Sequence, residues 1–280
     1  MTDMLTSLLP ELQDEILGHC ACGDLKNLAR ASKQWSEILR EKLFVNLRLP
    51  ASVLTSRSPV DNVISANLNE YTKRLRVVVM KERAVGDNEL TCILRLRGLT
   101  ELSIKGSQST TDADLATICE QLSALTVLDV GQTGITDSGL VHLAKLKHLR
   151  ELVLDSCRLL DAGLGVIAEL SSLRKLDISY SHDVTVDGVA LLKKLCALEE
   201  LVVKQCGLKN AAIAHIAKIS SLRRLDISYQ ALSDGGLRFL SPLKGLEELV
   251  LAQCNITDIG MSNNIKAFLE FHYQADEASL

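Results

Sequence analysis

The feature that most constrains the fold of this chain is a short template that recurs every 24 to 26 residues. It reads L-x-x-L-x-(L/I/V)-x-x-(C/S/T/Q), as in LRELVLDSC, LRKLDISYS and LEELVVKQC. A repeat of this length is one supersecondary unit, which buries its apolar face only by stacking on its neighbours. The chain is therefore predicted to form a solenoid. The second Leu of each copy falls at Leu102, Leu128, Leu152, Leu176, Leu201, Leu225 and Leu249.

An earlier copy precedes these seven. The segment RVVVMKE aligns best with Val77 in the place of the second Leu, 25 residues before Leu102. With this copy the repeats number about eight and occupy residues 75–270.

Each copy has two halves with different periodicity. The template alternates apolar and polar residues, which predicts a strand. The segment that follows, such as ITDSGLVHLAKL, has apolar residues at helical spacing. An Asp or Asn stands before each helical pattern, where an N-cap would accept backbone N–H groups. The expected unit is one strand and one return helix. The proposed caps are Asp112, Asp137, Asp161, Asp187, Asn210, Asp234 and Asp258.

A longer period is also visible. LRKLDISYS and LRRLDISYQ begin 49 residues apart, and LEELVVKQC and LEELVLAQC begin 48 residues apart. The solenoid is thus predicted to alternate two kinds of repeat.

The template resembles the leucine-rich repeat, in its cysteine-containing subclass. Cys157, Cys206 and Cys254 stand at the ninth position of L-x-x-L-x-L-x-x-C. The resemblance implies an α/β horseshoe with the strands on its concave side. The ninth position is expected to need a small or hydrogen-bonding group, because other copies replace the thiol with Ser107, Thr133, Ser181 and Gln230.

Residues 1–45 do not fit the repeat and are predicted to form three short helices, over about 9–20, 24–31 and 32–42. Their motif resembles an F-box. The residues that carry the resemblance are Leu8, Glu11, Ile16, Leu17, Asp24, Leu25, Ala31, Ser32, Lys33 and Trp35. It implies an all-α module that contacts an adaptor through, or with support from, Leu8, Pro10, Ile16, Leu17, Leu25, Leu28, Ser32 and Trp35.

An F-box followed by leucine-rich repeats implies the substrate-recognition subunit of an SCF-type ubiquitin ligase. The F-box would dock on a Skp-family adaptor, and through it on a cullin-RING ligase, while the repeats hold a protein substrate. The chain itself would be no enzyme. Two departures from the motif, Pro10 one position late and Cys20 at an aliphatic position, favour the alternative of a repeat scaffold without a ligase role. A ligand-binding receptor or enzyme with its ligand on the concave face is a third possibility.

The remaining segments are assigned by composition. Residues 46–74 are interpreted as a linker and the N-terminal cap of the solenoid, with a strand in FVNLRLP. Residues 271–280 form a polar tail.

The concave face is the predicted substrate surface. Asp129, Asp177 and Asp226 recur between core residues, two repeats apart, so they point away from the core. Carboxylates in a row suit a basic partner segment, and tyrosines are favoured anchors at interfaces. The predicted contacts are Asp129, Asp155, Asp177, Tyr180, Lys204, Asp226 and Tyr229.

Composition and motifs argue against other classes. The 31 basic and 35 acidic residues give a net charge of −4, unlike a dedicated nucleic-acid binder. No apolar run approaches the roughly 18 residues of a membrane span, and the acidic N-terminus is unlike a signal peptide. We therefore expect a cytoplasmic or nuclear protein. The sequence shows no catalytic motif, and the spacing in His19-Cys20-Ala21-Cys22 does not match a zinc site, so no cofactor or metal is expected.

Overall fold

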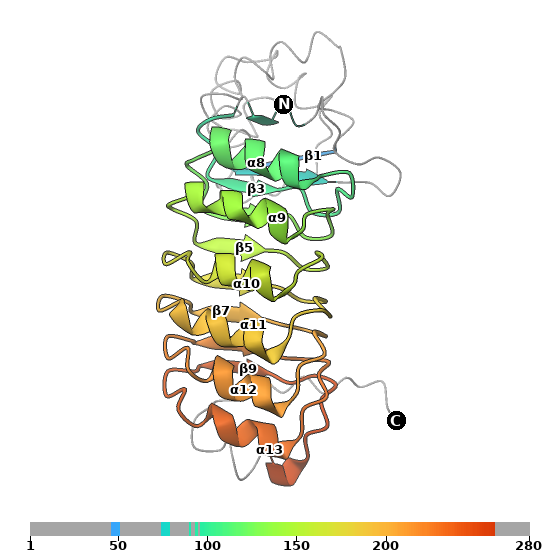
Figure 1. The fold of residues 1–280 in the computed structure, drawn as a ribbon, viewed down its shortest axis with the longest axis vertical. Helices are drawn as coiled ribbons and strands as arrows, with labels where there is room; N and C mark the ends of the chain where they lie inside the picture. The colour runs from blue at the N-terminus through green and yellow to red at the C-terminus, as the bar shows by residue number, and fades with distance from the viewer. Residues whose placement is uncertain (1–45, 51–73, 79–89, 91–92, 95, 261–280) are drawn as a thin grey trace, which may run out of the picture.

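The structure, a computed structural model, describes residues 46–50, 74–78, 90, 93, 94 and 96–260. The F-box-like residues 1–45 and the tail 271–280 lie outside these, so the predictions for them stay predictions. Nine strands of the described segments form one parallel sheet in sequence order. The repeats stack along the long axis of the molecule, with their helices on one side of the sheet (Figure 1).

The strands stack in the register that the template predicts. Leu102 pairs with Leu128, Leu128 with Leu152, and so on to Leu225 with Leu249. The strands are β1 (Asn46–Pro50), β2 (Arg74–Val78), β3 (Glu101–Ser103), β4 (Val127–Asp129), β5 (Glu151–Val153), β6 (Lys175–Asp177), β7 (Glu200–Val202), β8 (Arg224–Asp226) and β9 (Glu248–Val250).

The alignment of the first copy was wrong by two residues. Leu75, and not Val77, pairs with Leu102, and Leu47 of β1 pairs with Leu75. A shift of two residues leaves every side chain on the same face of a strand, so apolar alternation cannot detect it. The strand predicted in FVNLRLP is confirmed as β1.

The helical halves show the predicted two-repeat period. Repeats with Asp as the last residue of the strand have a short α-helix that continues into a 3-10 helix. Repeats with Val in that place have an α-helix alone. The helices are α8 (Asp112–Gln121), α9 (Asp137–Leu140) with η1 (Val141–Lys145), α10 (Asp161–Ile167), α11 (Val186–Leu191) with η2 (Leu192–Lys194), α12 (Asn210–Ile216), and α13 (Asp234–Leu237) with η3 (Arg238–Leu240).

One continuous core lies between the sheet and the helices. The template leucines of the strands, such as Leu152 and Leu176, are fully buried. They pack with helix residues such as Leu140, Leu164 and Ile213 in a single cluster. Burial of this kind stabilises by about 25 cal/mol per Å² of apolar surface, so each repeat depends on both neighbours.

The sequence analysis predicted that the Asp and Asn residues at the helix starts cap their own helices, and this prediction is wrong. The N-cap is the preceding residue, for example Thr136 before α9. The acidic side chain instead binds the N-cap residue of the next repeat. Asp161 accepts the backbone N–H of Thr185 at 2.8 Å and its hydroxyl at 2.6 Å. Asp112 accepts the same pair of groups from Thr136, at 2.8 and 2.6 Å.

These links join most consecutive repeats, and we call them the carboxylate ladder. Each rung leads from the first residue of one helix to the N-cap of the next. Asp137 binds the N–H groups of Leu160 and Gly163, because Leu160 has no hydroxyl. The ladder comprises Asp112 to Thr136, Asp137 to Leu160 and Gly163, Asp161 to Thr185, Asn210 to Ser233, and Asp234 to Thr257.

Candidate protein-interaction surface

The face of the sheet that points away from the helices is the candidate interaction surface, and we call it the strand face. It is the predicted concave face. The outer residues of each strand and the residues just after it contribute to it, while the central Leu is buried on the other side. The last residues of β3 to β9 form one column on this face. They are Ser103, Asp129, Val153, Asp177, Val202, Asp226 and Val250.

The three aspartates of this column each bind the backbone that follows their own strand. Asp177 Oδ1 accepts the N–H of Ser179 at 2.9 Å and its hydroxyl at 2.6 Å. Asp226 does the same with Ser228, at 3.1 and 2.7 Å. Short acidic side chains commonly bond the backbone two residues on. The column therefore has a structural role, which the sequence analysis missed although D-x-S recurs in it.

Two of the predicted contacts, Asp155 and Asp226, are buried and each forms an ion pair with a lysine. Lys105 lies 2.7 Å from Asp155, whose side chain is 7% exposed. Lys204 lies 2.9 Å from Asp226, whose side chain is 8% exposed. The hydrogen bond and the charge of Asp226 raise the pKa of Lys204. The predicted row of Asp129, Asp177 and Asp226 is therefore not open at Asp226, which pairs with a lysine one strand away. Asp155, a separate predicted contact, is buried against a lysine two repeats away.

A smaller group of half-buried carboxylates lies around Val153. Asp129 on β4 and Asp177 on β6 are in register with Val153 on β5, one strand spacing away on each side. Glu151 precedes Val153 by two residues on the same face of β5. Within the described residues none of the three carboxylates forms an ion pair. Burial raises the pKa of Asp177, against the opposing effect of the Ser179 hydrogen bonds.

Tyr180 and Tyr229 border this face and stand in left-handed backbone conformations. Their φ angles are 63° and 59°, and they are 42% and 46% exposed. The conformation lets the sheet ladder continue beyond the strands, because the N–H of Tyr180 reaches the carbonyl of Lys204 at 2.8 Å. Positive φ is uncommon outside glycine. The same template position holds Gly106, Gln132, Ser156, Gln205 and Gln253, all with positive φ.

The ninth template position faces the interior, as predicted. The thiol of Cys206 donates to the carbonyl of Ile178 at 3.4 Å, and the thiol of Cys157 donates to that of Val130 at the same distance. Burial raises the pKa of Cys206 to about 11, so the thiol stays protonated and can donate. Thr133 bonds the Val130 carbonyl at 2.6 Å in the same way. A hydrogen-bonding group is therefore what this position needs.

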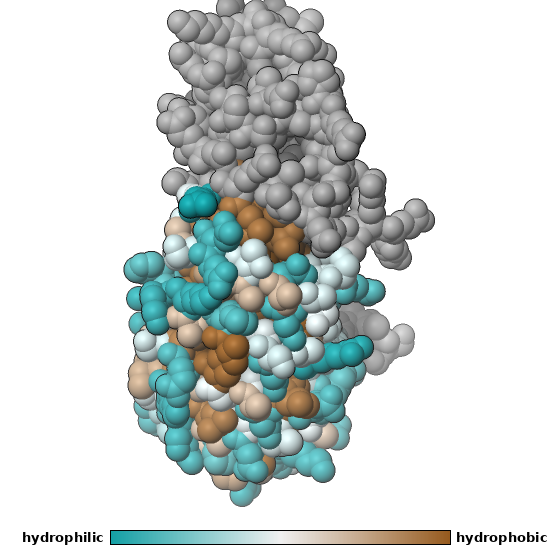
Figure 2. All heavy atoms as spheres, turned by 45° about the horizontal axis from the view of Figure 1, so that its top comes forward, coloured by the Kyte–Doolittle hydropathy of each residue, from teal (hydrophilic) through white to brown (hydrophobic). Residues whose placement is uncertain are grey.

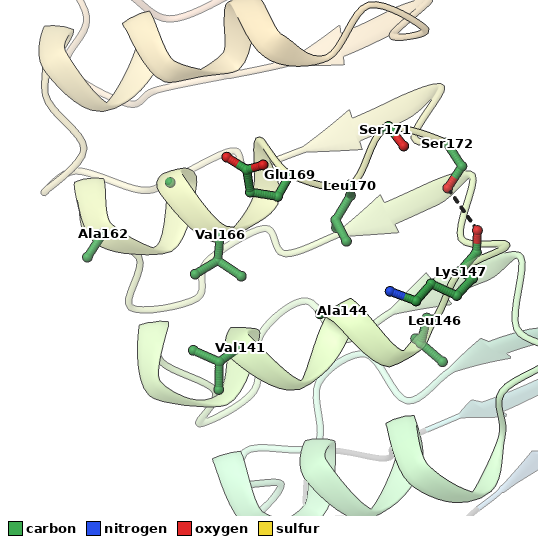
Figure 3. A pocket seen from close by; sticks show the side chains of 11 residues that line it. Val141, Ala144, Leu146, Lys147, Ala162, Val166, Glu169, Leu170, Ser171 and Ser172 are labelled. Carbon is green, nitrogen blue, oxygen red and sulfur yellow. Dashed lines mark hydrogen bonds between the residues drawn. The ribbon is translucent and has the colours of Figure 1, made fainter.

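A groove lies on the helix side of the solenoid. It lies between η1 and α10, encloses about 580 Å³ and is lined by short side chains such as Ala144, Ala162 and Val166 (Figure 3). Its polar rim is engaged in part, since the Ser172 hydroxyl donates to the carbonyl of Lys147 at 3.3 Å. The described part of the chain has no group of three His, Cys, Asp or Glu residues that could hold a metal ion.

Large apolar side chains are also exposed, but not as one continuous face. Val141, Leu160, Phe239 and Ile259 are between 43% and 71% exposed. Figure 2 shows the apolar atoms as separate patches among hydrophilic ones. Among the helices of the described segments, none is long and apolar enough to cross a membrane.

Comparison with known proteins agrees with this geometry. The family model for the leucine-rich repeat matches residues 122–144 and 246–263. The chain contains leucine-rich repeats. Its repeats resemble those in the crystal structure of an internalin, inlF, from Listeria monocytogenes str. 4b F2365, with 25% sequence identity and a TM-score of 0.56. The alignment covers 75% of this chain and 57% of the internalin, so the chain spans little more than half of that protein.

A second internalin of the same organism, inlC2, is similar at 22% identity and a TM-score of 0.48, over 78% of this chain and 79% of that one. A search of curated proteins finds no match. The family-model match and the likeness to inlF confirm the leucine-rich repeats and the α/β solenoid predicted from the sequence.

Proposed function

We propose that this chain is a leucine-rich-repeat interaction protein that serves as the substrate-recognition subunit of an SCF-type ubiquitin ligase. The repeats hold a substrate protein on the strand face, and residues 1–45 dock on a Skp-family adaptor. The chain performs no chemistry in this role. It raises the effective concentration of a substrate lysine near the ubiquitin-charged enzyme. The repeats support the interaction role, and the F-box resemblance of residues 1–45 supports the ligase role.

The observation that carries the proposal on the substrate side is the set of carboxylates around Val153 that form no ion pair within the described residues. An apolar side chain ringed by Asp129, Glu151 and Asp177 suits the aliphatic stem and charged head of a lysine or arginine. Tyr180, exposed at the end of β6, adds a rigid aromatic anchor nearby. The proposed partner is therefore a protein segment that presents a basic side chain.

The test on the adaptor side is a pull-down of a purified Skp-family adaptor. The full chain should bind it, and the chain shortened to residues 46–280 should not. If both bind equally, the F-box interpretation is wrong. If neither binds while the strand face still captures a partner, the function is that of a repeat scaffold without a ligase role. Pro10 and Cys20, which depart from the F-box pattern, favour that alternative.

The test on the substrate side uses a charge reversal chosen from the structure. Glu151→Lys with Asp177→Lys should weaken binding of an octalysine peptide by at least about tenfold at low salt, since attraction between exposed charges is screened by salt. The matched control is Asp183→Lys with Asp187→Lys, which changes the net charge equally at exposed positions outside the strand face. Equal weakening by both pairs would mean that only net charge matters. Asp226 is avoided because its carboxylate is already paired with Lys204.

A further inference from the structure

The carboxylate ladder is interrupted at one place within the described residues, between α11 and α12. The rung position is the first residue of each helix, and in α11 this residue is Val186. Asp187, which the sequence analysis placed in this column, lies one residue later and is exposed. No side chain in the described region accepts the backbone N–H of Lys209, the N-cap of α12. At the N-caps of α9, α10, α11 and α13, and at Thr257, a side chain of the preceding repeat accepts the backbone N–H.

The helix residue that packs against the rung also differs between α11 and α12. The third residue of each helix after a rung is a glycine, because the carboxylate takes the space of its Cβ. A Cβ added at Gly139, Gly163, Gly188, Gly236 or Gly260 would lie only 2.0 to 2.6 Å from the rung oxygen. In α12 this third residue is Ala212. Val186 and Ala212 therefore form a matched exception to an otherwise regular pairing.

An independent observation marks the same repeat. Ser181 occupies the ninth template position between β6 and α11, and its hydroxyl is buried without a hydrogen-bond partner. At the equivalent positions, Thr133 bonds the carbonyl of Val130, and Gln230 bonds both Val203 and Leu208. A buried polar group without a partner is destabilising. The repeat is therefore weakly held at two separate points.

We propose that the contact between α11 and α12, which we call the seam, is a built-in hinge at which the solenoid opens first. The strand edge stays joined across it, because β6 and β7 remain paired and the N–H of Tyr180 still reaches the carbonyl of Lys204. The helix edge lacks the link that the ladder supplies elsewhere. Opening is thus a rotation about the paired strands that separates α11 from α12.

The hinge lies between the two exposed tyrosines. Tyr180 belongs to the repeat before the seam, and Tyr229 lies two repeats further on. Opening changes the spacing of the two side chains, so a partner that contacts both selects one state of the seam. This consequence rests on the proposed function. The hinge itself does not, and the experiment below needs no partner.

Amide hydrogen exchange tests the hinge in the full chain. Ala168 at the end of α10 and Ala217 at the end of α12 are equivalent, since each amide bonds the residue four positions earlier at 2.9 Å and each residue is buried. The amide of Ala217 should exchange at least about tenfold faster than that of Ala168, because the N-cap of α12 lacks the charged hydrogen bond that Asp137 supplies to the N-cap of α10. Equal rates would overturn the proposal.

Variants separate the hinge from fraying of the chain end. Val186→Asp with Ala212→Gly restores the rung and should slow exchange at Ala217 by at least about tenfold, whereas Val186→Asp alone meets the Cβ of Ala212 and should not. The reverse exchange, Asp161→Val with Gly188→Ala, should open a second seam and speed exchange at Val189. If restoring the rung leaves Ala217 unchanged while the reverse exchange alters Val189, the missing rung is not the cause and the proposal fails.

Discussion

Asp161 at the start of α10 and Gly188 in α11 are a matched pair from neighbouring repeats. A Cβ at position 188 would lie 2.1 Å from Oδ1 of Asp161, the same oxygen that accepts the N–H of Thr185. The glycine is present because the carboxylate fills the space beside it. The carboxylate is present because the next helix start needs an acceptor.

Asp161→Ala should lower the free energy of unfolding by about 1–2 kcal/mol, because Thr185 loses the acceptor of both its N–H and its hydroxyl. The urea midpoint measures this loss. Asp187→Ala is the control: Asp187 is exposed and lies off the ladder, so its removal should change stability by less than about 0.5 kcal/mol. Similar losses in both variants would contradict the ladder.

Gly188→Ala should destabilise by about 1–3 kcal/mol, because the new methyl group overlaps the Asp161 carboxylate. Gly165→Ala, on the neighbouring helix, should instead stabilise by about 0.4–1 kcal/mol, since its Cβ would meet only the Leu191 side chain at 3.6 Å. Thermal denaturation of the two variants should therefore shift the midpoint in opposite directions. A shift in the same direction would show that helix propensity alone decides.

Tyr229→Gly should change stability little, because glycine removes the strain of the 59° φ angle while it loosens the unfolded chain. Tyr229→Val should cost about 1–2 kcal/mol, because a β-branched residue fits the left-handed region poorly. If the glycine variant is the less stable of the two in denaturant, then packing of the tyrosine ring, and not the backbone, dominates at this position.

Asp177→Asn should be at least as stable as the unchanged chain at pH 7. The amide oxygen can still accept the N–H and hydroxyl of Ser179, and no charge has to be buried. The advantage should shrink as the pH falls toward 4, because the raised pKa of Asp177 lets it take up a proton in the folded state before it would in the unfolded state. Stability measured as a function of pH decides this. An advantage that grows on acidification would mean that the Asp177 pKa is lowered.

The internalin likeness concerns the repeats. The alignment with inlF reaches 57% of that protein, and it supports the repeat fold and an interaction role only. The ligase role therefore depends on residues 1–45 and on the adaptor test. The substrate role depends on the residues around Val153, which come from this chain's own geometry.

The sequence by itself determined the repeat unit, its register from Leu102 onward and its alternation of two kinds. These depend on local periodicity, and each copy of the template repeats the same evidence for a strand or a helix. It also placed Asp177 on the strand face and the thiols of Cys157 and Cys206 in the interior. What it could not decide was which partner each polar side chain takes, because a spacing of 24 residues along the chain becomes a contact only when repeats stack.

Only the tertiary structure decided these partners. It turned the expected N-cap Asp161 into a link to Thr185, and it removed Asp155 and Asp226 from the open surface by pairing them with lysines. It also showed that Val186, and not Asp187, occupies the rung position of α11. The physical reason is common to all three. A side chain's hydrogen bonds depend on which groups of the neighbouring repeat lie within about 3 Å, and that distance is set by stacking rather than by sequence separation.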